Sequence, residues 1–356
     1  MKKTYLLLTL FLLNTSVACS QKENYPPIED FNKDSFSLEK IIDDIEIPWG
    51  LSFTGIDSFL VTDKKGILYH VSEGKKSIVE GTPDITLSRQ GGLLDVAVDL
   101  NFDNNNKIFL TASITSSDTG SNTALYSAIL SNNKLSDLRL LYKALPDSTE
   151  ERHFGGSILV TQEFVFFTIG DRGNRDVNPQ DITRDCGKIY RLNDDGTVPS
   201  DNPFVDTENA KTAIFSYGHR NPQGMTVHPK TGEIWENEHG PKGGDEINII
   251  LKGKNFGWPV ITYGVNYSGT SITDKRAMPG MEQPFYYWVP SIAPSGMAFS
   301  SSGVYRKWKG DLFVGSLKFK YLELELKLSF IAFELIIFLI WDTDWVITNE
   351  LSINAA

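Results

Sequence analysis

Short runs of β-forming residues, divided by polar turns, follow one another along most of the chain and limit what it can fold into. A polar turn followed by Ile or Leu, an aromatic residue and a further apolar residue recurs every ~50 residues, the length of one propeller blade. No long amphipathic helix interrupts the series. The pattern predicts an all-β fold, with a β-propeller as the best fit and an array of β-sandwiches as the alternative. The clearest runs are residues 57–62, 107–111, 164–169, 233–235 and 311–314.

Length and composition agree with this interpretation. The 356 residues allow one large all-β domain or two smaller ones, and 29 Gly and 16 Pro favour short strands joined by tight turns. The formal net charge is −11, which on average repels a polyphosphate, and no local basic patch is evident. A nucleic-acid partner is therefore not expected.

Residues 1–19 have the pattern of a secretory signal. Two lysines precede an apolar run over residues 5–13 that is too short to cross a bilayer, and small residues then lead to Cys19. This placement of Cys19 resembles the bacterial lipobox, in which the cysteine is lipidated and becomes the first residue of the mature protein. Plain cleavage is the alternative. We expect an exported, periplasmic protein that reaches the membrane only through an N-terminal lipid.

The rest of the chain divides by composition. Residues 20–38 are polar and contain Pro26 and Pro27, which is typical of a linker, and the predicted propeller occupies residues 39–322. Cys186 is the one other cysteine and has no intramolecular disulfide partner after export. We expect it to be a small buried residue.

Four segments combine glycines with polar side chains suited to chemistry. In residues 89–95, glycines allow a close approach to a ligand that Gln90 can hydrogen-bond, although a blade turn would look the same. In residues 152–156, His153 precedes two glycines, and a neutral imidazole suits proton abstraction near neutral pH. A purely structural histidine is the alternative there.

The other two segments carry charge. Arg172 and Arg220 are forked donors suited to carboxylates, Asn221 adds an amide, and Asp171 can accept a hydrogen bond from a sugar hydroxyl; solvated turns are the alternative. Residues 236–248 gather hard oxygen donors around flexible glycines, which suits calcium better than zinc.

Together these segments resemble the soluble PQQ-dependent aldose and glucose dehydrogenases, the glucose/sorbosone dehydrogenase family. The resemblance covers about residues 40 to 322. It implies a six-bladed propeller with pyrroloquinoline quinone (PQQ) on its top face, which oxidises aldose sugars and passes electrons to a cytochrome or a quinone. The motifs that carry it are residues 47–51, 90–94, 153–156, 168–173, 218–224, 238–241, 244–248, 255–259 and 315–318.

The resemblance also implies roles for single residues. His153 resembles the general base that takes the proton of the sugar hydroxyl while hydride passes to the quinone, and Arg220 resembles the arginine beside the reacting carbonyl. Gln90, Asn221 and Lys318 resemble further cofactor-binding positions. An acidic tricarboxylate cofactor is matched by such cationic donors.

Metal and substrate positions follow by the same resemblance. The main-chain carbonyls of Gly240 and Pro241 resemble ligands of the calcium that holds PQQ. Glu246 resembles a ligand of a second, structural calcium, and Asp171 resembles a position that contacts the sugar.

Residues 323–356 depart from the family. Family members continue for about one more blade with a pair of cofactor-clamping arginines, whereas no arginine follows Arg306 here and no Gly or Pro follows residue 317. A frameshift would explain this tail. We expect a propeller that is incomplete at its C-terminal blade, a tail forming an irregular or helical appendage, poor solubility and impaired activity. A calcium-dependent propeller lactonase and a non-catalytic propeller that binds a glycan or protein are the alternatives.

Overall fold

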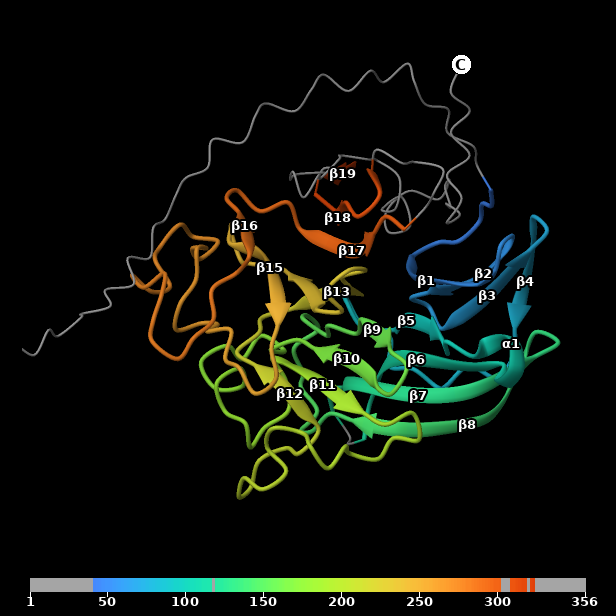
Figure 1. Ribbon diagram of the computed structural model, residues 1–356, viewed down its shortest axis with the longest axis horizontal. Coiled ribbons are helices and arrows are strands. Elements are labelled where there is room, and N and C mark those ends of the chain that lie inside the picture. Colours follow the sequence, from blue (N-terminus) through green and yellow to red (C-terminus); the bar gives the residue numbers. More distant parts are fainter. Residues whose placement is uncertain (1–40, 117–118, 302–307, 319–320, 324–356) are drawn as a thin grey trace, which may run out of the picture. The chain divides into compact units, whose positions relative to one another are not determined.

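β-Strands dominate the computed structural model, which describes residues 41–116, 119–301, 308–318 and 321–323 (Figure 1). The strands form four four-stranded sheets and one three-stranded sheet. The one helix in this part of the chain is the single turn α1 (Phe102–Asn105), and it is too short to span a membrane. The prediction of an all-β fold is confirmed.

Each sheet is an antiparallel meander of strands that are consecutive in the sequence. The first sheet holds β1 (Pro48–Gly55), β2 (Ser58–Asp63), β3 (Ile67–Ser72) and β4 (Lys75–Val79), and the second β5 (Leu93–Val98), β6 (Lys107–Ile114), β7 (Asn122–Ser131) and β8 (Lys134–Lys143). The third holds β9 (Ile158–Val160), β10 (Val165–Ile169), β11 (Lys188–Leu192) and β12 (Ile214–Tyr217). The fourth holds β13 (Pro222–Val227), β14 (Ile234–Glu238), β15 (Asp245–Ile250) and β16 (Tyr286–Trp288), and the fifth β17 (Pro294–Phe299), β18 (Leu312–Ser316) and β19 (Tyr321–Glu323).

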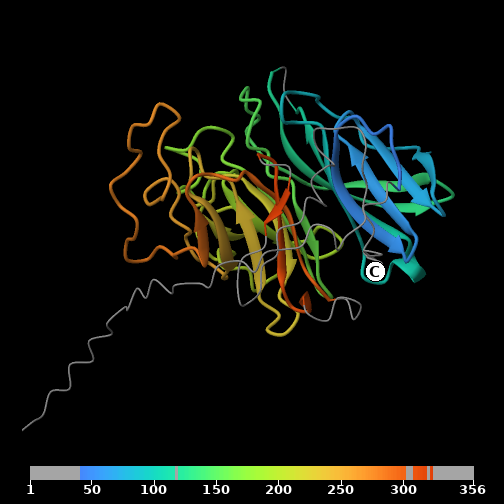
Figure 2. The same ribbon diagram turned by 90° about the horizontal axis from the view of Figure 1, so that it is seen from above.

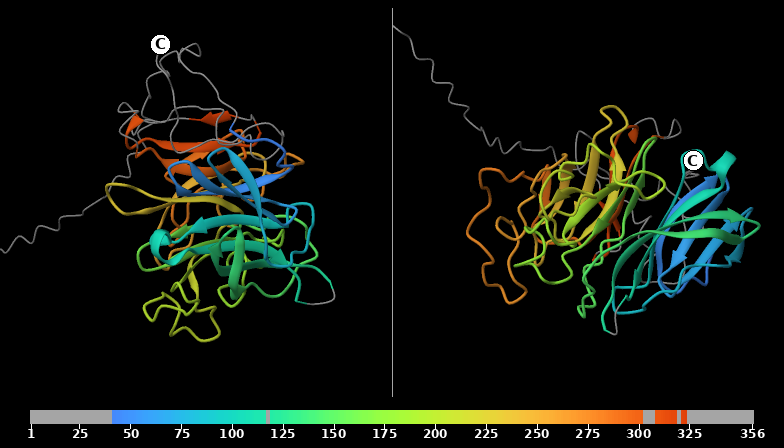
Figure 3. Two further views of the ribbon diagram at one scale, coloured as in Figure 1. Left: turned by 90° about the vertical axis from the view of Figure 1, so that its right-hand side faces the viewer. Right: turned by 90° about the horizontal axis from the view of Figure 1, so that it is seen from below.

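The first strands of the five sheets meet around one cavity. Residues of β1, β5, β9, β13 and β17 line it, and its volume is about 620 Å³. Neighbouring first strands also contact one another, β1 with β5, β5 with β9, β9 with β13 and β13 with β17. Figures 2 and 3 show the same twisted meanders from other sides. Innermost first strands around a central channel are the arrangement of propeller blades, and the β-sandwich alternative is wrong.

The expected number of six blades is wrong for the described residues, which form four complete blades and one three-stranded sheet. Successive first strands begin at residues 48, 93, 158, 222 and 294, so the spacing is 45 to 72 residues rather than a regular ~50. Long connections inside the blades, such as the one between β15 and β16, stretch the period. The signal segment with Cys19, the linker, and the tail beyond Glu323 lie outside the described residues.

The apolar core lies between neighbouring sheets. Because side chains alternate along a strand, Phe166 packs toward the fourth sheet against Met225, whereas Phe167 packs toward the second against Phe109. Cys186 is buried in the same core as Phe167, and burial raises the pKa of its thiol to about 11. The expectation of a small buried cysteine is confirmed.

Candidate active site

A pocket of about 220 Å³ lies among loops that leave the third and fourth sheets. His153 reaches it from just before β9, Asp171 from just after β10, and Arg220 from the turn between β12 and β13. The fold thus brings together four residues that the sequence analysis selected, from positions up to 88 residues apart. The lining residues are Arg152, His153, Asp171, Gly173, Arg175, Arg220, Pro241, Trp258, Asn266 and Tyr267.

His153 and Asp171 form a hydrogen-bonded pair at the pocket. The Nδ1 atom of His153 lies 2.7 Å from Oδ1 of Asp171, which also accepts the backbone N–H of Gly173 at 2.8 Å. The indole N–H of Trp258 donates to Oδ2 of Asp171 at 2.8 Å. Both carboxylate oxygens are therefore used, and the His153 ring is oriented with Nε2 as its remaining nitrogen.

The surroundings set the charge of this pair. Burial lowers the pKa of His153 below its usual value, and the charge of Arg220 adds to this against the opposing effect of Asp171. Burial alone would raise the pKa of Asp171, but the hydrogen bond and charge of His153, together with Arg220 and Trp258, hold it below its usual range. The result is a neutral imidazole next to an ionised carboxylate, the pairing required of a general base.

The backbone at His153 is held in an uncommon conformation. Its φ is 57°, in the left-handed region, and its N–H donates to Oε1 of Gln90 at 2.7 Å. Gly170 packs against the backbone of His153, and a Cβ atom on Gly170 would collide with the carbonyl oxygen of His153. Gln90 is not one of the pocket-lining residues, and its side-chain carbonyl accepts the backbone N–H of His153.

Arg172 does not serve as an anion-binding fork beside Arg220. It is fully buried, and its guanidinium stacks on Phe154 at 3.4 Å and donates to the carbonyl oxygens of Glu150 and Arg152. Burial lowers its pKa to about 10. Its contacts indicate that it shapes the loop that carries His153.

Arg220 and Asn221 connect the pocket to the following loop. The Nη1 of Arg220 donates to the carbonyl oxygens of His239 and Gly240 at 2.8 and 2.9 Å, and its guanidinium lies 5.4 Å from the ring centre of Trp258. Oδ1 of Asn221 accepts the N–H of Gly155 at 3.1 Å. Asn221 therefore ties the Arg220 turn to the loop of His153.

The residues expected at calcium are divided between two places. Pro241 lines the pocket. The preceding residue, Gly240, lies in a tight turn, and a Cβ atom on Gly240 would collide with the backbone of Gly244. Glu246 instead lies within the fourth sheet beside Asn248, whose Nδ2 is 3.5 Å from its Oε2. Burial and the nearby Glu238 raise the pKa of Glu246 well above its usual value. The structure does not place Glu246 at the pocket.

Lys318 is likewise not among the pocket-lining residues. Its Nζ donates to the carbonyl oxygen of Ser291 at 2.9 Å, and the Ser291 hydroxyl donates to Oδ2 of Asp245 at 2.7 Å. The other Asp245 oxygen accepts the N–H of Gly240 at 2.7 Å. Lys318 is thus connected to the Gly240 turn through two intermediate residues.

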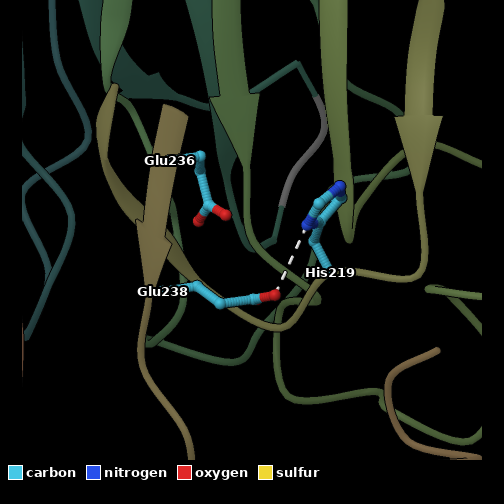
Figure 4. Close-up of side chains that lie close together, drawn as sticks. All are labelled: His219, Glu236 and Glu238. Atoms are coloured by element: carbon cyan, nitrogen blue, oxygen red, sulfur yellow. Dashed lines mark hydrogen bonds and ion pairs between the residues drawn. The ribbon is translucent and has the colours of Figure 1, made fainter. Parts of the chain in front are cut away.

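Two pocket-lining residues were missed from the sequence, and two carboxylates of the predicted oxygen-rich segment lie elsewhere. Trp258 and Asn266 line the pocket, but a tryptophan inside an apolar motif and an asparagine in a long connection carry no specific signal. Glu236 and Glu238 lie with His219 in a buried group (Figure 4). Their spacing of two residues along a strand gave a usable signal, since it places both carboxylates on one face of the sheet.

Comparison with known proteins agrees with this geometry. The sequence profile described as glucose/sorbosone dehydrogenase matches residues 45–329. The chain is 40% identical over 292 residues to the aldose sugar dehydrogenase YliI of Escherichia coli, covering 80% of this chain and 78% of that protein. It is 26% identical over 321 residues to quinoprotein glucose dehydrogenase B of Acinetobacter calcoaceticus, covering 81% and 65%.

Solved structures give the same result. The apo-form of the soluble aldose sugar dehydrogenase of Escherichia coli superimposes with a TM-score of 0.79 at 38% identity, covering 82% of this chain and 86% of that one. The PQQ-bound aldose sugar dehydrogenase of Streptomyces coelicolor shares the fold, with a TM-score of 0.65 at 22% identity over 81% and 80% of the two chains. The resemblance inferred from the sequence motifs is confirmed, and this chain belongs to the glucose/sorbosone dehydrogenase family.

Proposed function

We propose that this chain oxidises aldose sugars at the His153 pocket, with PQQ as electron acceptor and calcium beside it. The observation that carries the proposal is the pair of His153 and Asp171 facing a pocket that Arg220 also lines. A neutral imidazole held by a carboxylate is a general base, and an adjacent guanidinium is a site for an anion. Relatives that are sugar dehydrogenases support the same reaction class.

The residues present fit the anionic cofactor. Arg220 is only 6% exposed, yet within the described ranges no carboxylate forms an ion pair with its guanidinium. A buried cation whose hydrogen bonds go only to neutral carbonyl oxygens favours binding of an anion. Arg220 and Asn221 would hold PQQ, and the carbonyls of Gly240 and Pro241 would hold calcium. The family resemblance adds Gln90 and Lys318 as cofactor-binding residues, although neither lines the pocket. When bound, PQQ supplies a quinone that accepts the hydride from the sugar carbon.

The chain itself provides the proton chemistry. Nε2 of His153 takes the proton from the sugar hydroxyl whose carbon is oxidised. Asp171 keeps its hydrogen bond to Nδ1 and stabilises the imidazolium that forms, while Trp258 and the N–H of Gly173 fix the carboxylate. Because both oxygens of Asp171 are engaged, its geometry supports a positioning role more directly than the sugar contact that the family resemblance implies.

The lactonase alternative finds less support. It requires acidic ligands that converge on one axial metal, and the central cavity has Asp95 as its one charged lining residue in the described part of the chain. The two oxygens of Asp95 accept backbone N–H groups of Val96 and Ile158 at 2.8 Å each. A non-catalytic propeller that binds a glycan or protein would not require the hydrogen-bonded pair of His153 and Asp171 at the pocket.

Reconstitution of the purified chain tests the proposal. We expect reduction of an electron-accepting dye by aldoses after addition of PQQ and Ca²⁺, at a rate that the divergent residues 323–356 lower. EDTA should abolish that activity and lower the melting temperature. PQQ without calcium and calcium without PQQ are the matched controls. Binding of neither PQQ nor calcium, in protein that is folded, would refute the assignment.

The cellular location is a separate proposal. We infer that the chain is exported and anchored through a lipid on Cys19, because a basic start, a short apolar run and small residues precede this cysteine. Incorporation of labelled fatty acid by the wild type and not by C19A is the expected result. Equal labelling of both would contradict it.

A further inference from the structure

One tyrosine at the edge of the His153 pocket is largely exposed. Tyr267 lies in the long connection between β15 and β16, drawn in orange in Figure 1. It lines the pocket, yet it is 72% exposed, whereas the side chains of His153 and Asp171 are 13% and 1% exposed. The base therefore lies in the enclosed part of the pocket, and Tyr267 lies at its outer rim.

The turn that carries Tyr267 is held by its own hydrogen bonds. The N–H of Asn266 donates to the carbonyl oxygen of Thr270 at 2.9 Å, and the N–H of Gly269 donates to the carbonyl oxygen of Asn266 at 2.7 Å. The side-chain amide of Asn266 also donates to the hydroxyl of Thr270 at 3.0 Å. The backbone at Tyr267 is thus fixed without any contribution from the tyrosine side chain.

The same turn is tied to two walls of the pocket. On one side, the N–H of Lys242, next to Pro241, donates to the carbonyl oxygen of Val265 at 3.2 Å. On the other side, Nη1 of Arg175 donates to Oδ1 of Asn266 at 2.8 Å. Both Pro241 and Arg175 line the pocket. The position of Tyr267 relative to the pocket is therefore set by the walls themselves.

The ring of Tyr267 has no partner within the described part of the chain, either as a hydrogen bond or as a ring contact. By contrast, Tyr263 in the same connection stacks on Tyr287, with ring centres 3.7 Å apart, and its hydroxyl lies 3.1 Å from Oε1 of Gln283. Single exposed apolar residues are common on protein surfaces. Tyr267 differs because a fixed turn displays its uncovered ring at the rim of a pocket, where covering its apolar face would be favourable.

We propose that Tyr267 is a specificity-determining residue, whose ring stacks on the second sugar of a reducing oligosaccharide while the terminal sugar lies at His153. This inference rests on the proposed oxidation of aldoses at that pocket. A pyranose ring has an apolar face of C–H groups, which an aromatic ring can cover. Because exposure rises from His153 to Tyr267, the oxidised ring is the enclosed one, and the next ring of a longer saccharide extends toward Tyr267.

Steady-state kinetics with glucose, maltose and maltotriose tests this outer subsite in the full chain loaded with PQQ and Ca²⁺. Y267L keeps apolar bulk but loses the aromatic face, and Y267F keeps the ring. M278A is the control, because Met278 is 38% exposed in the same connection and does not line the pocket. We expect Y267L to raise the KM for maltose and maltotriose about 3- to 10-fold, with kcat and the KM for glucose little changed. Y267F and M278A should resemble wild type.

Saturation-transfer nuclear magnetic resonance gives a second readout that needs no turnover. The PQQ-free and PQQ-loaded proteins are examined with maltose and without an electron acceptor, while aromatic protons are irradiated. We expect transfer to the non-reducing ring of maltose in wild type and Y267F, and its loss in Y267L. Because Tyr267 is mostly exposed, Y267L should melt at the wild-type temperature.

Equal KM changes for all three sugars in Y267L would overturn the outer subsite, as would an unchanged KM for maltose. Absence of maltose contact in both wild-type preparations would overturn it too. If wild type contacts maltose through Tyr267 but oxidises no sugar, the proposed function fails and the subsite stands. If sugars are oxidised with the same preferences in wild type and Y267L, the subsite fails and the proposed function stands.

Discussion

Two histidines of this propeller lie beside carboxylates, and they differ in what surrounds them. His153 has one partner, Asp171, whose oxygens are both hydrogen-bonded, and it faces a pocket. His219 is fully buried beside two carboxylates, and one oxygen of Glu236 has no partner at all. The same residue types therefore serve different ends. Complete pairing with one free ring nitrogen at a pocket suits a base, whereas both ring nitrogens of His219 have partners, Ser216 and Glu238, and His219 does not line the pocket.

The largest expected effect separates His153 from other histidines. We expect H153A to lower the turnover of PQQ-reconstituted protein by ~10²-fold or more, the usual scale of losing a general base, with little change in melting temperature. The matched control is H70A, because His70 is a half-buried histidine with both ring nitrogens hydrogen-bonded, to Ser58 and Asn133. Turnover of H153A within a few-fold of H70A would remove the base from the mechanism.

The second effect concerns the Arg220 guanidinium, which lines the pocket without a carboxylate partner among the described residues. R220A should weaken PQQ binding by one to two orders of magnitude, because a charge-assisted hydrogen bond contributes ~1.5–3 kcal/mol. R175A is the control, since Arg175 lines the same pocket but lies 3.7 Å from Asp176 and donates to Asn266. Absorbance titration of the apo proteins with PQQ measures both affinities. Equal affinities of the two variants would contradict the anion site at Arg220.

The third effect tests what Asp171 does. We expect D171N to lower turnover by ~10-fold or more while the apparent affinity for sugar changes little, because Asp171 acts through His153. A direct sugar contact predicts the reverse, a raised KM with turnover largely kept. Steady-state kinetics with several aldoses distinguishes the two roles, and a change confined to KM would restore the sugar contact.

Much of this arrangement was predictable, for physical reasons. Strand alternation and turn residues indicated the all-β fold, and ordered motifs indicated the family. Glycine motifs identified the loops of His153, Asp171 and Arg220, because backbone that approaches a ligand closely needs glycine. The sequence did not indicate that both carboxylate oxygens of Asp171 would be hydrogen-bonded, one to His153 and the other to Trp258. Hydrogen bonds between distant loops depend on the tertiary fold.

Other features depended on the tertiary structure as well. Lys318 was expected at the cofactor, yet it does not line the pocket and donates to the carbonyl oxygen of Ser291. Glu246 was expected at a second, structural calcium, and it lies beside Asn248 in the fourth sheet. The six blades were inferred from the family resemblance, whereas the described residues form four four-stranded sheets and one three-stranded sheet. Glu236 and Glu238 were readable as one face of a strand, but their lack of partners becomes evident only when every neighbouring side chain is placed.

The smallest effect is a titration that sharpens the comparison without catalysis. In the cofactor-free protein we expect the imidazole of His153 to titrate below 6.5, because burial and Arg220 lower its pKa more than Asp171 raises it. The folded state then binds this proton less readily than the unfolded chain. The contribution of His153 to stability is therefore complete above pH ~6.5 and declines as the pH falls below that value. D171N removes the one influence that raises the pKa, so its midpoint should move further down.

Nuclear magnetic resonance of histidine-labelled apo protein measures both midpoints, and the spectrum of H153A assigns the signal among the five histidines. The direction of the D171N shift is the decisive quantity, because it depends on the contact between Nδ1 and the carboxylate and not on burial. A purely structural histidine that merely lies near Asp171 would keep its midpoint within experimental error. A wild-type midpoint above 7 would mean that the imidazole is mostly charged at neutral pH and is unsuited to take a proton from a sugar. An upward shift in D171N would mean that Asp171 does not stabilise the imidazolium.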